Sequence, residues 1–322
     1  MEVALTRRGA IVVTGASGFV GRALVERLRS AGREVRAIVR EDDGSVGDAI
    51  ALGALEGASE EALGRAFAGA SAVVHLAARA HAMRAAPGDP ESAYRAANVE
   101  STARVARAAV AAGVPRVVLA SSVKVNGEST PAGVPFRPGA PSAPQDAYGR
   151  SKRDAEIALA EACRGSSTAA IVLRLPLVVG PGARGNVARL VAAVAAGRTL
   201  PLGAIDNRRS VIGLANLCDA FVAAADAEPA PAGVHFVADA DPVSTPALVR
   251  AIARALGRPV PLAFVPVPLL RFAGRITGRG ADVDRLAGTL EVDASSFTAA
   301  TGWRPVHSLD DEFARIARAR SL

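Results

Sequence analysis

A glycine-rich turn near the start restricts the fold of this 322-residue chain more than any other feature. The short apolar run 10–14, mainly β-branched, precedes Gly15, Gly18 and Gly21, and an amphipathic segment with helical spacing follows. Glycines at such a turn let backbone N–H groups approach a diphosphate, and the N-terminus of the next helix favours negative charge. The pattern therefore predicts a dinucleotide site at this turn. Its other predicted members are Ser17, Phe19 and Val20.

Apolar runs and helical patterns alternate along the first half of the chain. Runs typical of strands occupy residues 35–39, 72–76, 117–120 and 170–173. Segments with helical spacing occupy residues 21–31, 91–112 and 146–163. Strands that alternate with helices form βαβ units, so we expect an α/β fold with a Rossmann-type, doubly wound parallel sheet.

The pattern changes after Pro176. Loops rich in glycine and proline separate three shorter helical segments, at residues 186–196, 214–225 and 245–256. We interpret the proline-rich stretch 259–268 as a rigid connector with an apolar face. We therefore expect two parts: a dinucleotide-binding domain at residues 1–175, and a smaller α/β substrate-binding lobe at residues 176–322 that is partly interleaved with it.

Composition argues against several classes of protein. The two cysteines, Cys163 and Cys218, lack Cys-x-x-Cys spacing, so we expect neither a disulfide framework nor a thiolate zinc site. The four histidines lack metal-ligand spacing, so no metal is predicted. The net charge of +7 comes from scattered arginines, which argues against a nucleic-acid partner and suits an anionic small molecule.

The hydrophobic segments predict neither export nor a membrane anchor. The first residues, 1–8, lack the apolar core of a signal peptide. No uninterrupted apolar run approaches the ~18 residues that a membrane helix needs. We therefore expect a cytoplasmic protein without a transmembrane segment.

A tyrosine and a lysine four residues apart form the candidate catalytic pair. Tyr148 is one of two tyrosines and Lys152 one of two lysines, and their spacing places both on one face of the predicted helix. A phenol is a weak base at neutral pH, but an adjacent ammonium lowers its pKa. Tyr148 then exchanges a proton with a substrate while a hydride moves to or from nicotinamide. Ser121 and Ser122, at the carboxyl end of the strand 117–120, are candidates for a third member.

Together, the glycine turn, the serines and the Tyr–Lys pair resemble the extended short-chain dehydrogenase/reductases, in particular the family of NAD-dependent nucleotide-sugar epimerases, dehydratases and reductases. The resemblance covers most of the chain. Five further segments resemble motifs of this family: residues 72–78, 98–102, 173–181, 207–211 and 302–305.

The resemblance implies roles for individual residues. It makes Ser122 the catalytic serine beside Tyr148 and Lys152. It implies a cofactor site formed by the glycine turn and the Tyr–Lys pair together with Leu76, Ala77, Ala78, Asn98 and Pro176. It implies substrate contacts from His81, Lys124, Asn186 and Arg209, with the last contacting a nucleotide diphosphate. It also implies a homodimer.

Two positions depart from the family's pattern. Asn126 stands where relatives carry a tyrosine. Val123 and Lys124 follow Ser122, where the family's sugar 4,6-dehydratases carry Asp-Glu, so dehydration is disfavoured. Lys124 is then either a solvated loop residue or a contact to a substrate oxygen.

The end of the second predicted strand bears on the choice of dinucleotide. A chain that binds NAD usually carries Asp or Glu there, which takes the ribose 2′-hydroxyl. This sequence has Val39 followed by Arg40, and the first carboxylate is Glu41. Arg40 either pairs with a 2′-phosphate or lies in solvent. We predict NADP(H), with NAD(H) as the alternative.

Three functions are compatible with these residues. The first is an oxidoreductase acting at C4 of a nucleotide sugar, either a UDP-4-keto-hexose 4-reductase, which NADPH would favour, or a UDP-hexose 4-epimerase. The second is a ketoreductase acting on a lipid, steroid or other apolar ketone, with residues 261–272 lining the site; Arg209 argues for a diphosphate instead. The third is a non-enzymatic cofactor-binding subunit, which the Tyr–Lys pair disfavours.

Overall fold

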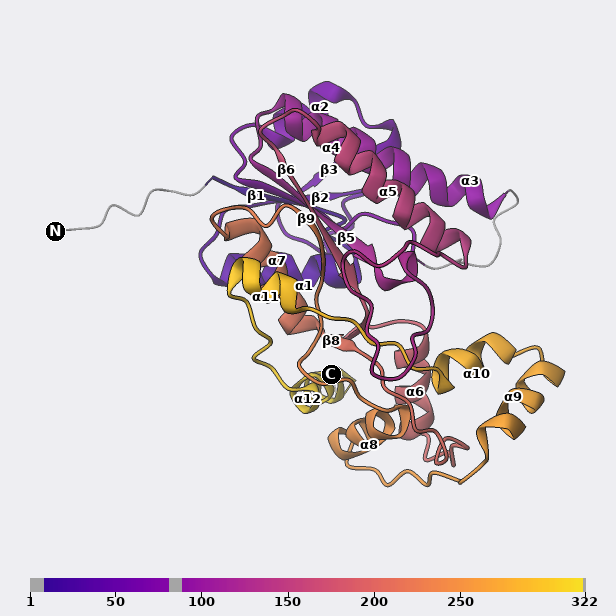
Figure 1. Cartoon of the computed structure of the whole chain (residues 1–322). Coiled ribbons are helices and arrows are strands. Elements are labelled where there is room, and N and C mark those ends of the chain that lie inside the picture. The colour runs from indigo at the N-terminus through magenta and orange to yellow at the C-terminus, as the bar shows by residue number, and fades with distance from the viewer. Residues whose placement is uncertain (1–8, 81–88, 321–322) are drawn as a thin grey trace.

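The computed structural model describes residues 9–80 and 89–320. Within these residues seven strands form one parallel sheet, in the order β3-β2-β1-β4-β5-β6-β9 (Figure 1). The strands are β1 (Ile11–Thr14), β2 (Val35–Val39), β3 (Ala49–Ala51), β4 (Ala72–His75), β5 (Arg116–Ser122), β6 (Ala169–Leu175) and β9 (Gly233–Phe236). The predicted doubly wound sheet is confirmed. Its order reverses between β1 and β4, where open α/β sheets bind their ligands.

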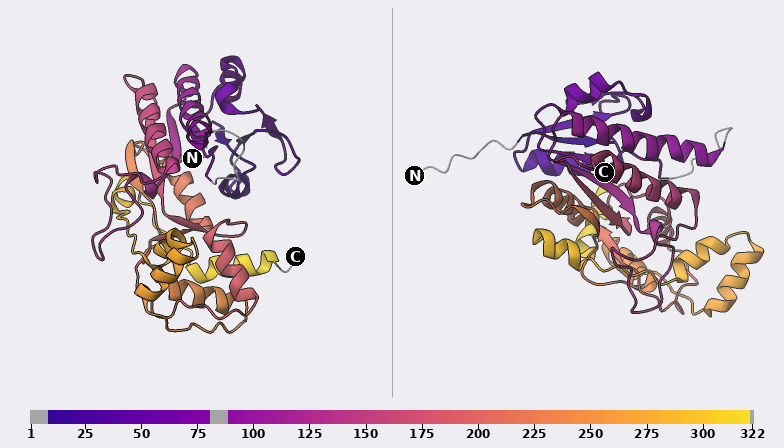
Figure 2. Two further views of the ribbon diagram at one scale, coloured as in Figure 1. Left: turned by 90° about the vertical axis from the view of Figure 1, so that its right-hand side faces the viewer. Right: turned by 45° about the horizontal axis from the view of Figure 1, so that its top comes forward.

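Helices cover both faces of the sheet. One face is covered by α1 (Phe19–Ser30), α7 (Leu214–Asp226) and α11 (Ser295–Thr301). Figure 2 shows on the other face, side by side, α2 (Glu60–Phe67), α4 (Ser101–Ala111) and α5 (Ala147–Cys163). The strands are continuous apolar runs because both faces are buried. Separate buried clusters lie on the two sides, one around Phe221 and one around Phe67.

Two local features differ from the sequence-based prediction. The helix predicted at 91–112 consists of α3 (Pro90–Tyr94), a π-helical segment (Arg95–Glu100) and α4. The elements β3 and α2 were not predicted, because a three-residue edge strand and a two-turn helix carry little periodic signal.

The chain after Pro176 builds a second core. There β7 (Leu177–Val179) pairs in parallel with β8 (Val211–Gly213). The predicted helices are present as α6 (Asn186–Ala195), α7 and α8 (Thr245–Ala255). The proline-rich stretch is only partly a connector, because α9 (Val267–Ile276) begins inside it and Pro268 occupies the first turn, where its missing N–H costs no helical hydrogen bond. Next to α9 lies α10 (Gly280–Ala287).

Segments far along the chain complete the first sheet. Strand β9 pairs with β6, and α7 packs against α1. The two parts are therefore joined by more than one crossing of the chain, and the division at residue 175 stays a prediction.

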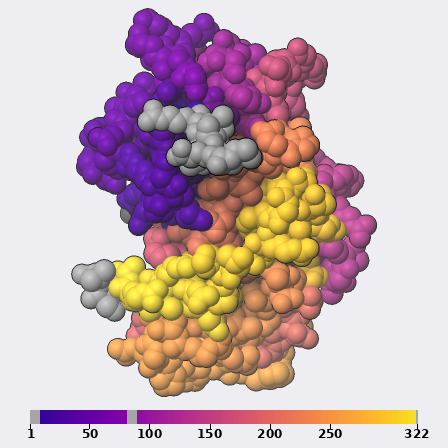
Figure 3. Space-filling model, turned by 90° about the vertical axis from the view of Figure 1, so that its left-hand side faces the viewer, coloured from indigo at the N-terminus to yellow at the C-terminus, as the bar shows by residue number. Residues whose placement is uncertain are grey.

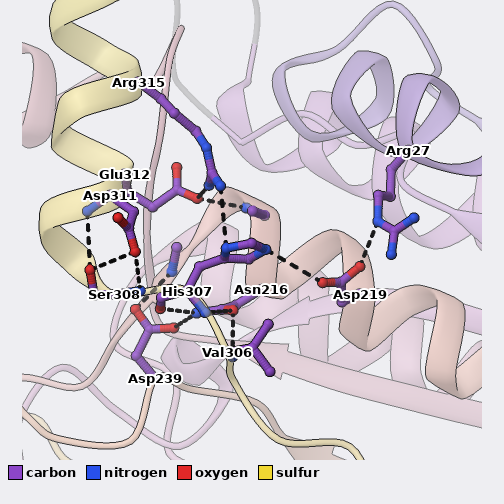
Figure 4. Close-up of polar contacts among 12 residues, drawn as sticks. Arg27, Asn216, Asp219, Asp239, Val306, His307, Ser308, Asp311, Glu312 and Arg315 are labelled. Atoms are coloured by element: carbon purple, nitrogen blue, oxygen red, sulfur yellow. Dashed lines mark hydrogen bonds and ion pairs between the residues drawn. The ribbon is translucent and has the colours of Figure 1, made fainter. Parts of the chain in front are cut away.

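The C-terminal segment, drawn in yellow in Figure 3, lies across the junction of the two parts. A buried polar cluster holds it there (Figure 4). The Asn216 side chain in α7 accepts the backbone N–H groups of Val306 and His307 and donates to the Asp239 carboxylate, at 3.0, 2.9 and 2.7 Å. Glu312, on α12 (Leu309–Arg320), accepts the backbone N–H of Ala215 at 3.0 Å.

The described ranges contain no helix that is both long and apolar enough to cross a bilayer. In those same ranges, His, Cys, Asp and Glu side chains nowhere gather in a group of three or more that could hold a metal ion.

Candidate active site

The glycine turn lies between β1 and α1, as predicted. Gly15 has φ +68°, and a Cβ there would lie 2.6 Å from the Ala77 nitrogen. A Cβ on Gly21 would lie 2.2 Å from the Gly15 oxygen. Gly18 is the N-cap residue of α1 and provides no side-chain cap, and the first helical turn contains no acidic residue. The turn therefore presents a compact backbone and a free helix N-terminus, which fit a dinucleotide diphosphate.

The end of β2 bears on the choice of dinucleotide. Val39 is buried at the end of β2, and Arg40 follows it with an exposed side chain. Beyond it, the carboxylates of Asp42 and Asp43 accept the backbone N–H groups of Gly44 and Ser45. These bonds shape the loop, and Arg40 is the first charged side chain after the strand.

A buried histidine joins β1 to β4. His75 Nδ1 lies 2.7 Å from Thr14 Oγ1, and Nε2 lies 3.1 Å from Thr102 Oγ1. The Thr102 hydroxyl donates to the Asn98 carbonyl, so it accepts from Nε2–H, and Nδ1 accepts from Thr14. Burial, and secondarily Lys152, lowers the pKa of His75 to about 3. This neutral imidazole fixes the strand ends from which Gly15 and the predicted cofactor segment Leu76–Ala78 extend.

Asn98 positions the segment after β4. Its Oδ1 accepts the Arg79 N–H at 2.7 Å, and its Nδ2 donates to the Arg79 carbonyl at 3.2 Å and to Ser151 Oγ at 2.8 Å. The side chain thus links the π-helical segment to α5, and its direct contact with a cofactor stays a prediction. His81 lies outside the described residues.

The Tyr–Lys pair and the serine come together at the carboxyl end of β5. Asp146 caps α5 by accepting the Gly149 N–H at 2.7 Å, and this starts the helix just before Tyr148. One turn later, the buried Lys152 donates from Nζ to the Ala120 carbonyl at 2.8 Å. Tyr148 and Ser122 share a side-chain hydrogen bond. This arrangement is suited to proton transfer to or from a substrate oxygen.

The predicted lowering of the Tyr148 pKa is wrong for this structure. Burial raises the pKa of Tyr148 to about 12, against the effect of its hydrogen bond with Ser122. Burial also lowers the pKa of Lys152 to about 8, while the Glu156 carboxylate opposes this shift. The lysine ammonium bonds the Ala120 carbonyl. The Asp146 carboxylate acts on the pKa of Tyr148 in the same direction as desolvation, whereas for Lys152 desolvation outweighs the opposing Glu156 charge.

A buried ion pair behind the site was missed by the sequence analysis. Arg174 on β6 holds Glu156 on α5 through two bonds, Nε–Oε1 at 3.0 Å and Nη2–Oε2 at 2.6 Å. Arg174 also donates to Asn126 Oδ1 at 2.9 Å, and the Ser121 hydroxyl donates to Glu156. Ser121 is therefore committed to this network, which leaves Ser122 for the site. The i, i+4 spacing of Lys152 and Glu156 could have indicated that Glu156 lies on the same helix face as the catalytic pair.

Asn126 and Lys124, which depart from the family's pattern, both contact other parts of the protein. Asn126 donates from Nδ2 to the carbonyls of Ala140 and Pro141, at 3.1 and 3.2 Å, and so holds a loop as well as Arg174. Lys124 lies between Glu128 and Asp146, at 2.8 and 2.5 Å, rather than free in solvent. Its ammonium is thus paired within the protein, and a substrate contact stays a prediction.

The remaining predicted residues lie on the lobe side of the site. Pro176 follows Leu175, which is beside Ser122 in the β5–β6 register. Arg209 donates from Nη1 to the carbonyls of Arg285 and Gly288 at 2.7 and 2.9 Å, and burial lowers its pKa. Asn186 begins α6, and its Oδ1 accepts from Arg189 at 2.5 Å. Arg209 and Asn186 both have protein partners, so their roles toward a substrate stay predictions.

The chain is similar to known proteins over most of its length. The model of the NAD dependent epimerase/dehydratase family matches residues 11–238. The chain is 37% identical to UDP-glucose 4-epimerase of Vibrio cholerae over 318 residues, which is 96% of this chain and 94% of that protein. It is 30% identical to 2-alkyl-3-oxoalkanoate reductase of Stenotrophomonas maltophilia over 77% of this chain and 76% of that protein.

A solved structure is similar over the same length. MoeE5 in complex with UDP-glucose and NAD superimposes with a TM-score of 0.74 at 26% identity, covering 97% of this chain and 99% of that one. The glycine turn, the Ser–Tyr–Lys site and the extent of these matches lead to one conclusion: the chain belongs to the NAD dependent epimerase/dehydratase family and is an NAD(P)-dependent enzyme.

Proposed function

We propose that this enzyme transfers a hydride at C4 of a UDP-hexose and acts as a UDP-hexose 4-epimerase. The observation that carries the proposal is the convergence of Ser122, Tyr148 and Lys152 at the carboxyl end of β5, the edge of the parallel sheet at which the glycine turn after β1 also lies. The similarity to the Vibrio cholerae UDP-glucose 4-epimerase over 96% of the chain supports the substrate class and the net reaction.

The chain's own residues account for the proton transfers. Tyr148, acting as the phenolate, takes the proton of the sugar 4-hydroxyl as the hydride leaves C4, and returns it when the hydride comes back to the opposite face. Ser122, hydrogen-bonded to the phenol, orients the 4-oxygen. The nicotinamide, when bound, accepts and returns the hydride. Arg209 is our candidate for holding the diphosphate while the hexose turns.

A UDP-4-keto-hexose 4-reductase is the second candidate, and Arg40 favours it. Arg40 follows β2 with an exposed side chain and has no carboxylate at the preceding position. A guanidinium there suits a ribose 2′-phosphate, so this second candidate would use NADP(H) in preference to NAD(H). Arg40→Ala should then weaken NADPH binding and leave NADH binding unchanged, as measured by fluorescence titration. An equal effect on both dinucleotides would contradict this preference.

One pair of assays separates the two reactions. UDP-glucose is supplied with no added cofactor and its C4 epimer is quantified, while a UDP-4-keto-hexose is supplied with NADPH or NADH and nicotinamide absorbance is followed. Conversion of UDP-glucose without net consumption of cofactor supports the epimerase. Stoichiometric loss of NADPH with no epimer formed would replace it by the reductase.

The apolar-ketone alternative receives less support. The relative from Stenotrophomonas maltophilia is named as a reductase of such a ketone, and the stretch 261–272 was its predicted lining. Phe264, just before α9, and Phe272, on α9, are instead exposed. Apolar side chains that face solvent do not line a ketone site.

We also propose a homodimer, as the resemblance implies. Helices α4 and α5 lie side by side on the face of the first sheet opposite to α1 and α7, and Ile157 on α5 is exposed. Light scattering coupled to size-exclusion chromatography should give twice the mass of the chain. Ile157→Glu should shift the mass toward the monomer.

A further inference from the structure

Helix α9 exposes an unusual apolar stripe. Leu269, Phe272 and Ile276 are 55%, 61% and 71% exposed, and Phe264, just before the helix, is 79% exposed. The three helical positions recur at i, i+3 and i+7, so they share one face. Of the seven large hydrophobic residues exposed in the described ranges, four lie in this short segment.

The opposite side of α9 is anchored to the lobe. Gly274 is buried, and a Cβ there would lie 2.8 Å from Val283 Cγ2 of α10. Val267 and Leu270 pack against the core of the lobe. The exposed stripe is therefore an outward face of a docked helix and not a frayed end. Figures 1 and 2 place α9 at the outer edge of the molecule.

The same segment carries excess positive charge. Arg271, Arg275 and Arg279 are all exposed. Arg271 bonds Asp284 at 3.0 Å, whereas Arg275 and Arg279 make no ion pair with the described parts of the chain. No Asp or Glu occurs between Asp241 and Asp282.

We propose that this face, defined by Phe264, Leu269, Phe272 and Ile276 with its flanking arginines, binds the surface of an anionic lipid bilayer. Phenylalanine, leucine and isoleucine enter the boundary between headgroups and acyl chains, while arginines contact lipid phosphates. A second copy of the chain fits less well, because a symmetric contact would bring the two sets of arginines together. The inference does not depend on the proposed substrate.

Vesicle co-sedimentation of the full chain tests the proposal. The protein should pellet with vesicles of equimolar phosphatidylcholine and phosphatidylglycerol, should pellet far less with phosphatidylcholine alone, and should be released by salt. The double variant Phe272→Glu/Ile276→Glu should bind vesicles about tenfold or more weakly. Burial of one such apolar side chain in the bilayer raises the affinity by about tenfold, and the variant loses two. Arg275→Gln/Arg279→Gln should weaken binding to anionic vesicles only.

The matched control is Val306→Glu, which changes a valine that is 76% exposed elsewhere on the surface and should bind like the wild type. Thermal melting of each variant shows that it folds. Failure of the wild type to pellet with anionic vesicles would overturn the proposal, as would equal loss in the Val306 variant. A fall in mass by light scattering in the Phe272/Ile276 variant, with lipid binding unchanged, would assign the face to self-association instead.

Discussion

Two opposing effects set the pKa of Lys152. Burial disfavours its ammonium, while the carboxylate of Glu156 stabilises it from one turn further along α5. The net pKa of about 8 leaves Lys152 protonated at neutral pH. A step that needs this ammonium is therefore active below about pH 8 and declines as the pH rises through that value.

Glu156→Gln should move this decline to lower pH, because the charge that raises the pKa of Lys152 is removed. It also leaves Arg174 buried without its counter-ion, which should cost on the order of 3–5 kcal/mol of stability. The checks are kcat/KM against pH and thermal melting. Arg174→Gln is the control: it damages the same ion pair but keeps the carboxylate, so it should lower the melting temperature without shifting the decline downward. An unmoved pH profile for Glu156→Gln would contradict the assigned coupling.

Tyr148→Phe should abolish most turnover while cofactor binding persists. The ring packs against Tyr94 with centroids 6.1 Å apart, and phenylalanine keeps that contact while losing the hydroxyl that reaches Ser122. We expect turnover of UDP-glucose to fall by ~10² or more. Turnover close to that of the wild type would show that another group moves the proton.

Among the secondary-structure elements, α1 packs directly against the backbone of the glycine turn that joins it to β1. Gly21 lies against the Gly15 carbonyl with no room for a side chain. Gly64, in α2, has nothing within 4 Å of the place where a Cβ would lie. Both residues are helical, so they form a natural pair for separating packing from helix propensity.

Gly64→Ala should stabilise the protein by roughly 0.5–1 kcal/mol, because alanine favours the helix. Gly21→Ala should destabilise it by about 1–3 kcal/mol, because overpacking outweighs the same gain. Chemical denaturation measures both, and dinucleotide titration should show weaker binding for the Gly21 variant alone. A stabilising Gly21→Ala would mean that the turn is wider than described here.

In the whole molecule, the C-terminal segment is held in place by two neighbouring carboxylates, Asp239 and Glu312, which bind backbone N–H groups at the start of α7. Asp239 accepts the Gly213 N–H at 3.0 Å, and Glu312 accepts that of Ala215. Burial, and secondarily Glu312, raises the pKa of Asp239 to about 6. Asp239 therefore binds its proton more tightly in the folded protein than in the unfolded chain, and its contribution to stability rises as the pH falls from about 6 to about 4.

Asp239→Asn should remove this contribution. The free energy of unfolding of the wild type, minus that of the variant, should be larger at about pH 4 than at about pH 7. Denaturant titrations at both pH values measure the difference. A constant difference between the two proteins would show that Asp239 does not titrate in this range.

Much of the fold was predictable because its signals are local. Three glycines in the turn indicate that backbone segments approach closely there. The spacing of Tyr148 and Lys152 indicates that both lie on one face of a helix. The parallel sheet follows from alternating strand and helix patterns. The π-helical segment at residues 95–100 carries no such signal, since its apolar spacing resembles that of an ordinary helix.

Local patterns in the chain are enough to predict strands β1, β2, β4, β5 and β6, the glycine turn and the Tyr–Lys pair, because each depends on spacings within one or two neighbouring elements. The pairing of Arg174 with Glu156, the contacts of Lys124 with two carboxylates and the place of β9 in the first sheet become evident only when the chain is folded. The tertiary structure also decided the sign of the Tyr148 pKa shift. The physical reason is that ion pairing and desolvation depend on which distant segments meet, and spacing along the chain does not encode those distances.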